Sequence, residues 1–261
     1  MTVRQPAVAG SFYPAQPARL TSTILGFLDA APPGPAAPVY VVPHAGYVYS
    51  GSTAAPAYAT LRAEPPSRVL VIGPTHRIAV RGLALAGATS YATPLGDVQV
   101  DAELTQRLAA LDSVTTRPDV HAQEHSTEVQ LPFLQVVAPG AEVVMVAAGM
   151  ATGNQVAEAI DVAVELGATV LLSSDLSHYH PYDIARRIDR ATVAQILSLA
   201  GPVDHDQACG ATPVNGGMVA AARHGWRPRL LGQCTSGDTA GSRDRVVGYA
   251  AIAFEEGATD G

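Results

Sequence analysis

Two histidines stand directly after short runs of apolar, β-branched residues. The run Val39–Val42 is followed by Pro43 and His44, and the run Val69–Ile72 is followed by "GPTH", which ends in His76. Glycine allows a close backbone approach and proline fixes a turn, so both segments are typical of strands that end abruptly beside an imidazole. Neutral imidazole is a common ligand of Fe(II) and Zn(II). The pattern therefore indicates metal chemistry at two strand ends.

Further histidines and carboxylates stand near other segment boundaries of the chain. They are Asp175 and His178 in "SSDLSH", Asp238 in "CTSGD", and Glu124 and His125 in "EHSTE". Two histidines and one carboxylate from three separate segments can form the facial triad of non-haem iron enzymes, which leaves positions open for substrate or O₂. These residues are the candidate site.

Each of these residues also has an ordinary structural interpretation. A histidine after a strand can be a hydrogen-bonded structural residue, and Asp175 can cap a helix. Ser126 or Thr127 can cap the helix that follows, which would leave His125 exposed. Asp238 can sit in a turn and bond its own backbone. The residues alone leave both interpretations open.

Other catalytic signatures are absent from the sequence. It contains no Gly-x-Ser-x-Gly elbow, no phosphate-binding P-loop and no Gly-x-Gly-x-x-Gly opening a helix. A nucleophile at Cys209 or Cys234 has no local support, and the two cysteines are not spaced as a zinc-knuckle pair. Metal-site chemistry is the strongest hypothesis that remains.

Alternating strand and helix patterns are expected to position these residues. Helices are predicted over residues 18–30, 51–61, 102–111 (with Asp101 as N-cap), 126–137, 154–167 and 183–199, and strands over Val39–Val42, Val69–Ile72, 82–87, 141–149, 169–175, 227–233 and 245–254. This alternation predicts one α/β domain over residues 1–261, with a mostly parallel or mixed sheet covered by helices on both faces. In such folds ligands bind beyond the carboxyl ends of the strands, where His44 and His76 are expected.

Composition excludes several classes of partner. Of 261 residues, 48% are hydrophobic and 15% charged, which indicates a globular chain, and the net charge of −7 argues against a nucleic-acid partner. No apolar run approaches the roughly 20 residues needed to cross a bilayer, so no membrane association is expected. Two cysteines form no disulfide framework. A cytoplasmic location is the expectation.

The chain resembles the Memo family, called AmmeMemoRadiSam system protein B in prokaryotes. The segments that carry the resemblance occur in family order from Pro6 to Phe254: "PAVAGSFYP", "PHAGYVYSG", "GPTH", "EHSTEVQLPFL", "SSDLSHY", "CGATPV" and "TSGD" followed by "RVVGYAAIAF". The resemblance implies a fold like that of the LigB-type, class III extradiol dioxygenases, which are non-haem iron enzymes.

The resemblance also implies a set of site residues. His44 and His76 match two metal ligands, and the third position falls on Asp238, or on Cys234 four residues earlier. His178 matches a general base. Asp175 and the pair Glu124 and His125 match other residues of the pocket. Fe(II) is the metal implied first, with Cu or Zn as alternatives.

The candidate residues and the resemblance together leave three functions open. The first is an O₂-dependent redox enzyme on an unknown substrate, with His178 as base and Asp175 orienting it. The second is a non-catalytic module that binds a peptide or small molecule in the same pocket. The third is a metal-dependent hydrolase in which His178 or Glu124 takes a proton from water. The resemblance further implies association with radical-SAM and AMMECR-type proteins.

Overall fold

The main sheet runs through the middle of the protein in the computed structural model, which describes residues 2–257. Its strands lie in the order β10-β12-β2-β9-β3-β8-β4-β7, and β11 pairs with the outer side of β12. The central strands are β2 (Val39–Val42), β9 (Thr169–Ser173), β3 (Arg68–Pro74) and β8 (Glu142–Ala148), and they are parallel. Their carboxyl ends therefore meet at one edge of the sheet.

The outer strands make the sheet mixed. β12 (Val246–Glu255) runs antiparallel to β2, β10 (His178–His180) and β11 (Arg227–Thr235), and β4 (Leu83–Leu85) runs antiparallel to β8 and parallel to β7 (Val114–Thr116). A separate three-stranded sheet contains β1 (Val3–Arg4), β5 (Ser90–Thr93) and β6 (Gly96–Gln99). The mixed sheet agrees with the prediction from the sequence.

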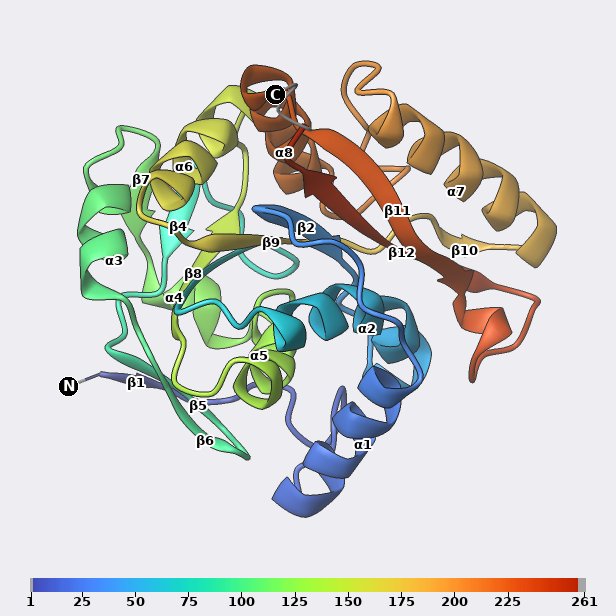
Figure 1. Ribbon diagram of the computed structural model, residues 1–261, viewed down its shortest axis with the longest axis horizontal. Coiled ribbons are helices and arrows are strands. Elements are labelled where there is room, and N and C mark those ends of the chain that lie inside the picture. The colour runs from blue at the N-terminus through green and yellow to red at the C-terminus, as the bar shows by residue number, and fades with distance from the viewer. Residues whose placement is uncertain (1, 258–261) are drawn as a thin grey trace.

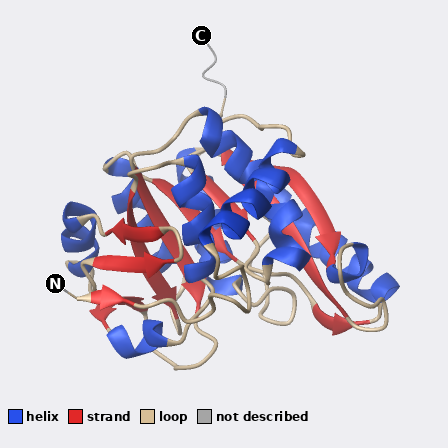
Figure 2. Cartoon of the chain, turned by 90° about the horizontal axis from the view of Figure 1, so that it is seen from below, coloured by secondary structure: helices blue, strands red, loops and turns tan. Residues whose placement is uncertain are grey.

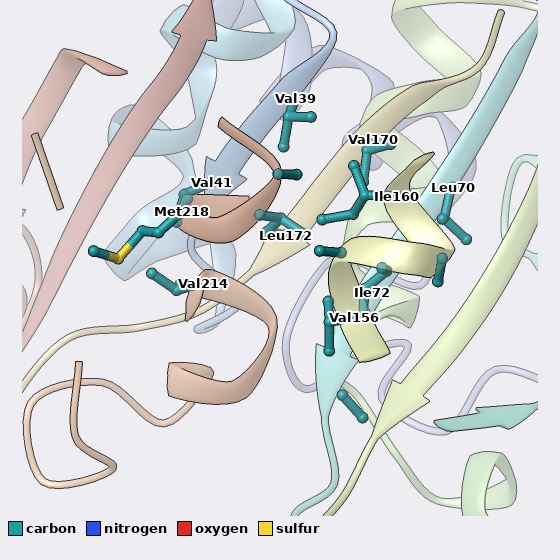
Figure 3. Packing of buried hydrophobic residues seen from close by; sticks show 14 of the residues in the cluster. Val39, Val41, Leu70, Ile72, Val156, Ile160, Val170, Leu172, Val214 and Met218 are labelled. Atoms are coloured by element: carbon teal, nitrogen blue, oxygen red, sulfur yellow. The ribbon is translucent and has the colours of Figure 1, made fainter. Parts of the chain in front are cut away.

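Helices cover both faces of the main sheet, because each central strand is apolar on both sides (Figures 1 and 2). One apolar cluster joins one set of strand side chains to α1 (Pro17–Asp29), α2 (Tyr47–Ala63) and α5 (Leu131–Val137). The opposite cluster joins the alternate side chains to α3 (Ala102–Ala109), α6 (Gly153–Glu165), α7 (Tyr182–Leu197) and α8 (Ala211–His224). Figure 3 shows Val156 and Ile160 of α6 and Val214 and Met218 of α8 against the strands.

Most predicted elements are confirmed, and the differences have local causes. α2 begins at Tyr47, four residues before the prediction, and Asp101 caps α3 by accepting a hydrogen bond from the Leu104 backbone. The predicted helix over 126–137 is a 3₁₀ turn, η1 (Glu128–Gln130), followed by α5. α8 was not predicted, because the glycines and proline in its sequence lower helix propensity.

Two short elements complete the described part of the chain. α4 (Pro118–Ala122) precedes the loop that holds Glu124, and η2 (Ser236–Asp238) follows β11. None of the described helices is both long and apolar enough to cross a membrane.

Candidate metal centre

His44 and His76 converge beyond the ends of β2 and β3, as the sequence predicted. Their ring centroids lie 5.2 Å apart, with the ring planes at 76°. The third residue that joins them is Cys209, which stands just before α8. The ligand atoms of His44, His76 and Cys209 all lie within 4.8 Å of one another, and the His44 Nε2 atom lies 3.2 Å from the Cys209 sulfur. Two imidazoles and one thiol thus form a compact donor group.

Asp238 does not lie with the two histidines. One oxygen of its carboxylate accepts hydrogen bonds from the Thr235 backbone N–H and hydroxyl, both at 2.9 Å, and the other accepts from Tyr182. Asp238 therefore fits the structural interpretation, in which its carboxylate caps the 3₁₀ turn that contains it. The alternative, Cys234, also lies elsewhere, with its sulfur 2.8 Å from the Thr53 hydroxyl. Cys209 is the third member of the described donor group that contains His44 and His76.

Glycine makes the position of Cys209 accessible. A side chain at Gly210 would place its Cβ 2.5 Å from the Ser173 carbonyl oxygen, so only glycine lets this segment approach the end of β9. Cys209 and the two histidines therefore have one sequence feature in common, since a glycine or proline stands within two residues of each. Cys209 was not predicted as a donor, because it follows a loop and no strand pattern in the sequence precedes it.

A buried hydrogen-bond network fixes which nitrogen of His44 carries the proton. The Gln130 amide donates to the Pro43 carbonyl and to the Ser173 hydroxyl, at 3.0 and 2.8 Å. Ser173 gives its single proton to the Ser126 carbonyl at 2.6 Å. Its oxygen can then only accept from His44 Nδ1, 2.9 Å away, so Nδ1 carries the proton. The lone pair of Nε2 is left facing Cys209.

Glu124 orients His76 in the same way. Its carboxylate accepts hydrogen bonds from the His76 ring at 2.9 Å and from the backbone N–H groups of His76, His125 and Ser126. Burial by itself would raise the pKa of Glu124, but these hydrogen bonds outweigh it and lower the pKa to about 2. The ionised carboxylate holds the proton of the His76 ring on Nδ1. The lone pair of Nε2 is then free to bind a metal. This arrangement is common among metal-binding histidines.

Burial keeps the other imidazoles of the site neutral. Burial, followed by the neighbouring charges of His125 and His76, lowers the pKa of His44 well below 6.5. Burial likewise lowers the pKa of His125 to about 4, and it lowers the pKa of His178. Neutral imidazoles can bind a metal or accept a proton, which a protonated ring cannot.

Asp175 contacts the backbone of His44 and not its ring. Its Oδ1 atom accepts the His44 backbone N–H at 2.8 Å, and burial raises its pKa to about 7. No hydrogen bond joins Asp175 to His178 within residues 2–257, so its role as the group that orients His178 does not fit this geometry. It holds the strand end that carries His44 instead. Burial also raises the pKa of the Cys209 thiol.

The donor group opens into a cavity of about 1020 Å³. Six of the eight histidines of the chain line it, including His178 and His125. Tyr179 also lines it and has a φ of 62°, at the irregularity in pairing between His178 and His180. A non-glycine residue in this conformation costs about 1–3 kcal/mol and is typical of functional sites.

Comparisons with known proteins establish the fold and the family of the chain. The chain has the LigB-like α/β fold, and it superposes on an uncharacterized protein from Escherichia coli K12 with a TM-score of 0.53 at 14% identity, covering 83% of this chain and 99% of that one. The chain belongs to the Memo family, since the family described as Memo-like protein matches residues 4–253.

Relatives match over nearly their whole length. A MEMO1 family protein of Methanopyrus kandleri is 39% identical, over 97% of this chain and 99% of its own. A MEMO1 family protein of Sulfolobus acidocaldarius is 37% identical with the same coverage. The family and fold expected from the sequence motifs are confirmed.

Proposed function

We propose that the protein is a metal-dependent redox enzyme in which His44, His76 and Cys209 hold Fe(II). The observation that carries this proposal is the convergence of the three donors within 4.8 Å, with the proton of each histidine held on Nδ1. Bound Fe(II) would supply electron transfer and O₂ chemistry to a substrate in the cavity. The donor set of two imidazoles and a thiol also suits Cu and Zn, which compete with Fe(II) for this assignment.

The residues around the donors would do the proton chemistry. His178 lines the cavity and is neutral at pH 7, so it can accept a proton from a substrate hydroxyl. His125 packs against His76 with ring centroids 4.6 Å apart, and it shares Glu124 as a neighbour. His125 and Glu124 therefore serve as positioning residues, while His178 is the proposed base.

Anaerobic titration with Fe(II), followed by nitric oxide, tests this proposal. Nitric oxide reports an open coordination position through its electron paramagnetic resonance signal. We expect one Fe(II) per chain and a nitric oxide signal in the wild type, and neither in His44→Ala. His224→Ala is the matched control, because His224 is exposed on α8 and pairs with Asp161. Stoichiometric Fe(II) in His44→Ala would rule out His44 as a ligand.

A metal-dependent hydrolase is the second candidate. The presence of a thiol in place of a carboxylate favours it, since Zn²⁺ readily takes cysteine and histidine ligands. Zinc as the metal of the freshly purified protein, together with hydrolysis that depends on His178, would favour this function. Ligand binding without turnover would instead favour the binding module. Association with radical-SAM and AMMECR-type proteins and a cytoplasmic location stay predictions.

A further inference from the structure

The cavity extends from the donor group to the outer edge of the main sheet. β12 is antiparallel to β2, so the start of β12 and the end of β2 meet at the same edge. Arg245, Val247 and Tyr249 all line the cavity, with the period of two that places side chains on one side of a strand. Arg245 stands four residues before Tyr249, which corresponds to about 13 Å along an extended chain.

Arg245 has free hydrogen-bond donors at the outer part of this cavity. Its guanidinium packs over the Tyr179 ring, 5.5 Å from the ring centroid. It makes no ion pair and no side-chain hydrogen bond to any residue of the described range 2–257. Arg243, two residues earlier, differs, because it pairs with Asp238 and donates to the Gly237 carbonyl. Arg245 is therefore oriented by an aromatic ring while its N–H groups stay available.

The surroundings of Arg245 suit an anion. His180 and His205 line the same cavity and offer further ring N–H groups, while Asp206 is the exposed carboxylate on the lining. A planar guanidinium binds a carboxylate or phosphate through two parallel hydrogen bonds, and stacking on a ring fixes its plane in advance.

We propose that Arg245 recognises the anionic group of a small organic acid or organic phosphate. The body of this ligand would pack against the aromatic residues Phe12, Tyr49 and Tyr249 of the cavity and extend toward the donor group. The proposal rests on the proposed function in one respect, since it names the substrate class for the same cavity. The anion contact itself needs no metal.

Binding of simple probes to metal-free protein tests this assignment. Phenylacetate, phenyl phosphate and the neutral phenylacetamide are titrated, and their Kd values are measured by protein-observed NMR. We expect at least one anion to bind about tenfold or more tightly than the amide, as charge-assisted hydrogen bonds allow. The tighter of the two anions names the group that the site prefers.

Variants then assign the preference to one residue. Arg245→Gln is expected to remove the preference for the anion, Arg245→Lys to keep part of it, and the control Arg243→Gln to leave it intact. Equal binding of anion and amide by the wild type, or an unchanged preference in Arg245→Gln, would overturn the proposal. NMR spectra of the ligand-free variants establish whether they are folded. If Arg245→Gln is not folded, Arg245→Lys tests the same contact.

Metal uptake separates this proposal from the proposed function. Arg245→Gln should take up Fe(II) as the wild type does, because Arg245 is not among the donors. A wild type that prefers the anion but takes up no metal would refute the metal site and leave the anion site standing. A wild type that takes up metal without preferring the anion would do the reverse.

Discussion

At the scale of single residues, the chemistry depends on where two protons sit. His44 and His76 each donate from Nδ1 to a fixed acceptor, Ser173 or Glu124. Ser173 can only accept from His44 because the Ser126 carbonyl takes its one proton. Each ring therefore presents an unprotonated Nε2 without any need for a metal to select the tautomer.

Removing the acceptor should weaken metal binding. We expect Ser173→Ala to lower Fe(II) affinity about 10- to 100-fold, because His44 can then place its proton on either nitrogen. Chelator competition measures the affinity, and ¹⁵N shifts of the His44 ring report the tautomer. Ser177→Ala is the control, since Ser177 is buried like Ser173 but its hydroxyl makes no hydrogen bond to His44, His76 or Cys209 within residues 2–257. Equal affinities in both variants would argue against the acceptor role.

The low pKa of His125 predicts acid sensitivity of the metal-free protein. Burial lowers this pKa from 6.5 to about 4 in the folded state, so the unfolded chain binds a proton first as the pH falls. The contribution of His125 to the free energy of unfolding is fully present above pH 6.5, and it is lost as the pH falls from 6.5 toward 4. Between pH 7.5 and 5, His125 alone should lower the free energy of unfolding by about 2 kcal/mol.

Urea unfolding in the presence of a chelator measures this loss. His125→Asn cannot gain the proton, so its free energy of unfolding should fall by about 2 kcal/mol less than that of the wild type over the same pH range. An equal fall in the two proteins would show that folding does not lower the pKa of His125.

At the scale of elements, the N-terminal segment holds the loop that carries Glu124. Arg4 of β1 pairs with the buried Glu128 and donates to the carbonyls of His121 and Glu124, at 2.9 and 2.7 Å. Glu128 in turn accepts hydrogen bonds from the N–H groups of Ala7 and Val8 and from the Tyr13 hydroxyl. The position of His76 therefore depends, through Glu124, on N-terminal residues that precede Glu124 by more than 100 positions in sequence.

Breaking this pair should cost far more than breaking a surface pair. Arg4→Met leaves the Glu128 carboxylate buried without its cation, so we expect a loss of about 3–5 kcal/mol in the free energy of unfolding. Arg62→Met removes the exposed pair with Asp29 and should cost less than about 1 kcal/mol. Chemical denaturation compares the two variants, and similar losses would contradict the account of the buried network.

Local patterns explain which parts of this site the sequence could predict. His44 and His76 were predictable because apolar runs, proline and glycine mark the strand ends that carry them. The role of Asp238 could not be distinguished from the sequence, because a carboxylate in a turn has the same local sequence whether it binds a metal or caps the turn. Cys209 depends on how α8 packs beside β9, and the acceptors Ser173 and Gln130 depend on contacts between distant segments. No local period encodes such contacts.

At the scale of the whole molecule, both apolar clusters share the strands of one sheet. The cluster with α1, α2 and α5 and the cluster with α6, α7 and α8 contain alternate side chains of the same central strands. Disruption of these strands would therefore disrupt both clusters at once. This sharing supports the single-domain prediction for residues 1–261.

Calorimetry tests that prediction. We expect one thermal transition whose van't Hoff and calorimetric enthalpies agree, because the two faces should unfold together. Two resolved transitions, or a calorimetric enthalpy well above the van't Hoff value, would indicate separate folding units.

The most direct test of the metal centre is X-ray absorption at the iron edge of Fe(II)-loaded protein. We predict one sulfur atom and imidazole nitrogens bonded to the iron, with the sulfur lost in Cys209→Ser and retained in Cys234→Ser and Asp238→Asn. Iron without a sulfur ligand in the wild type, or a sulfur that persists in Cys209→Ser, would contradict the assignment of His44, His76 and Cys209 as the metal ligands.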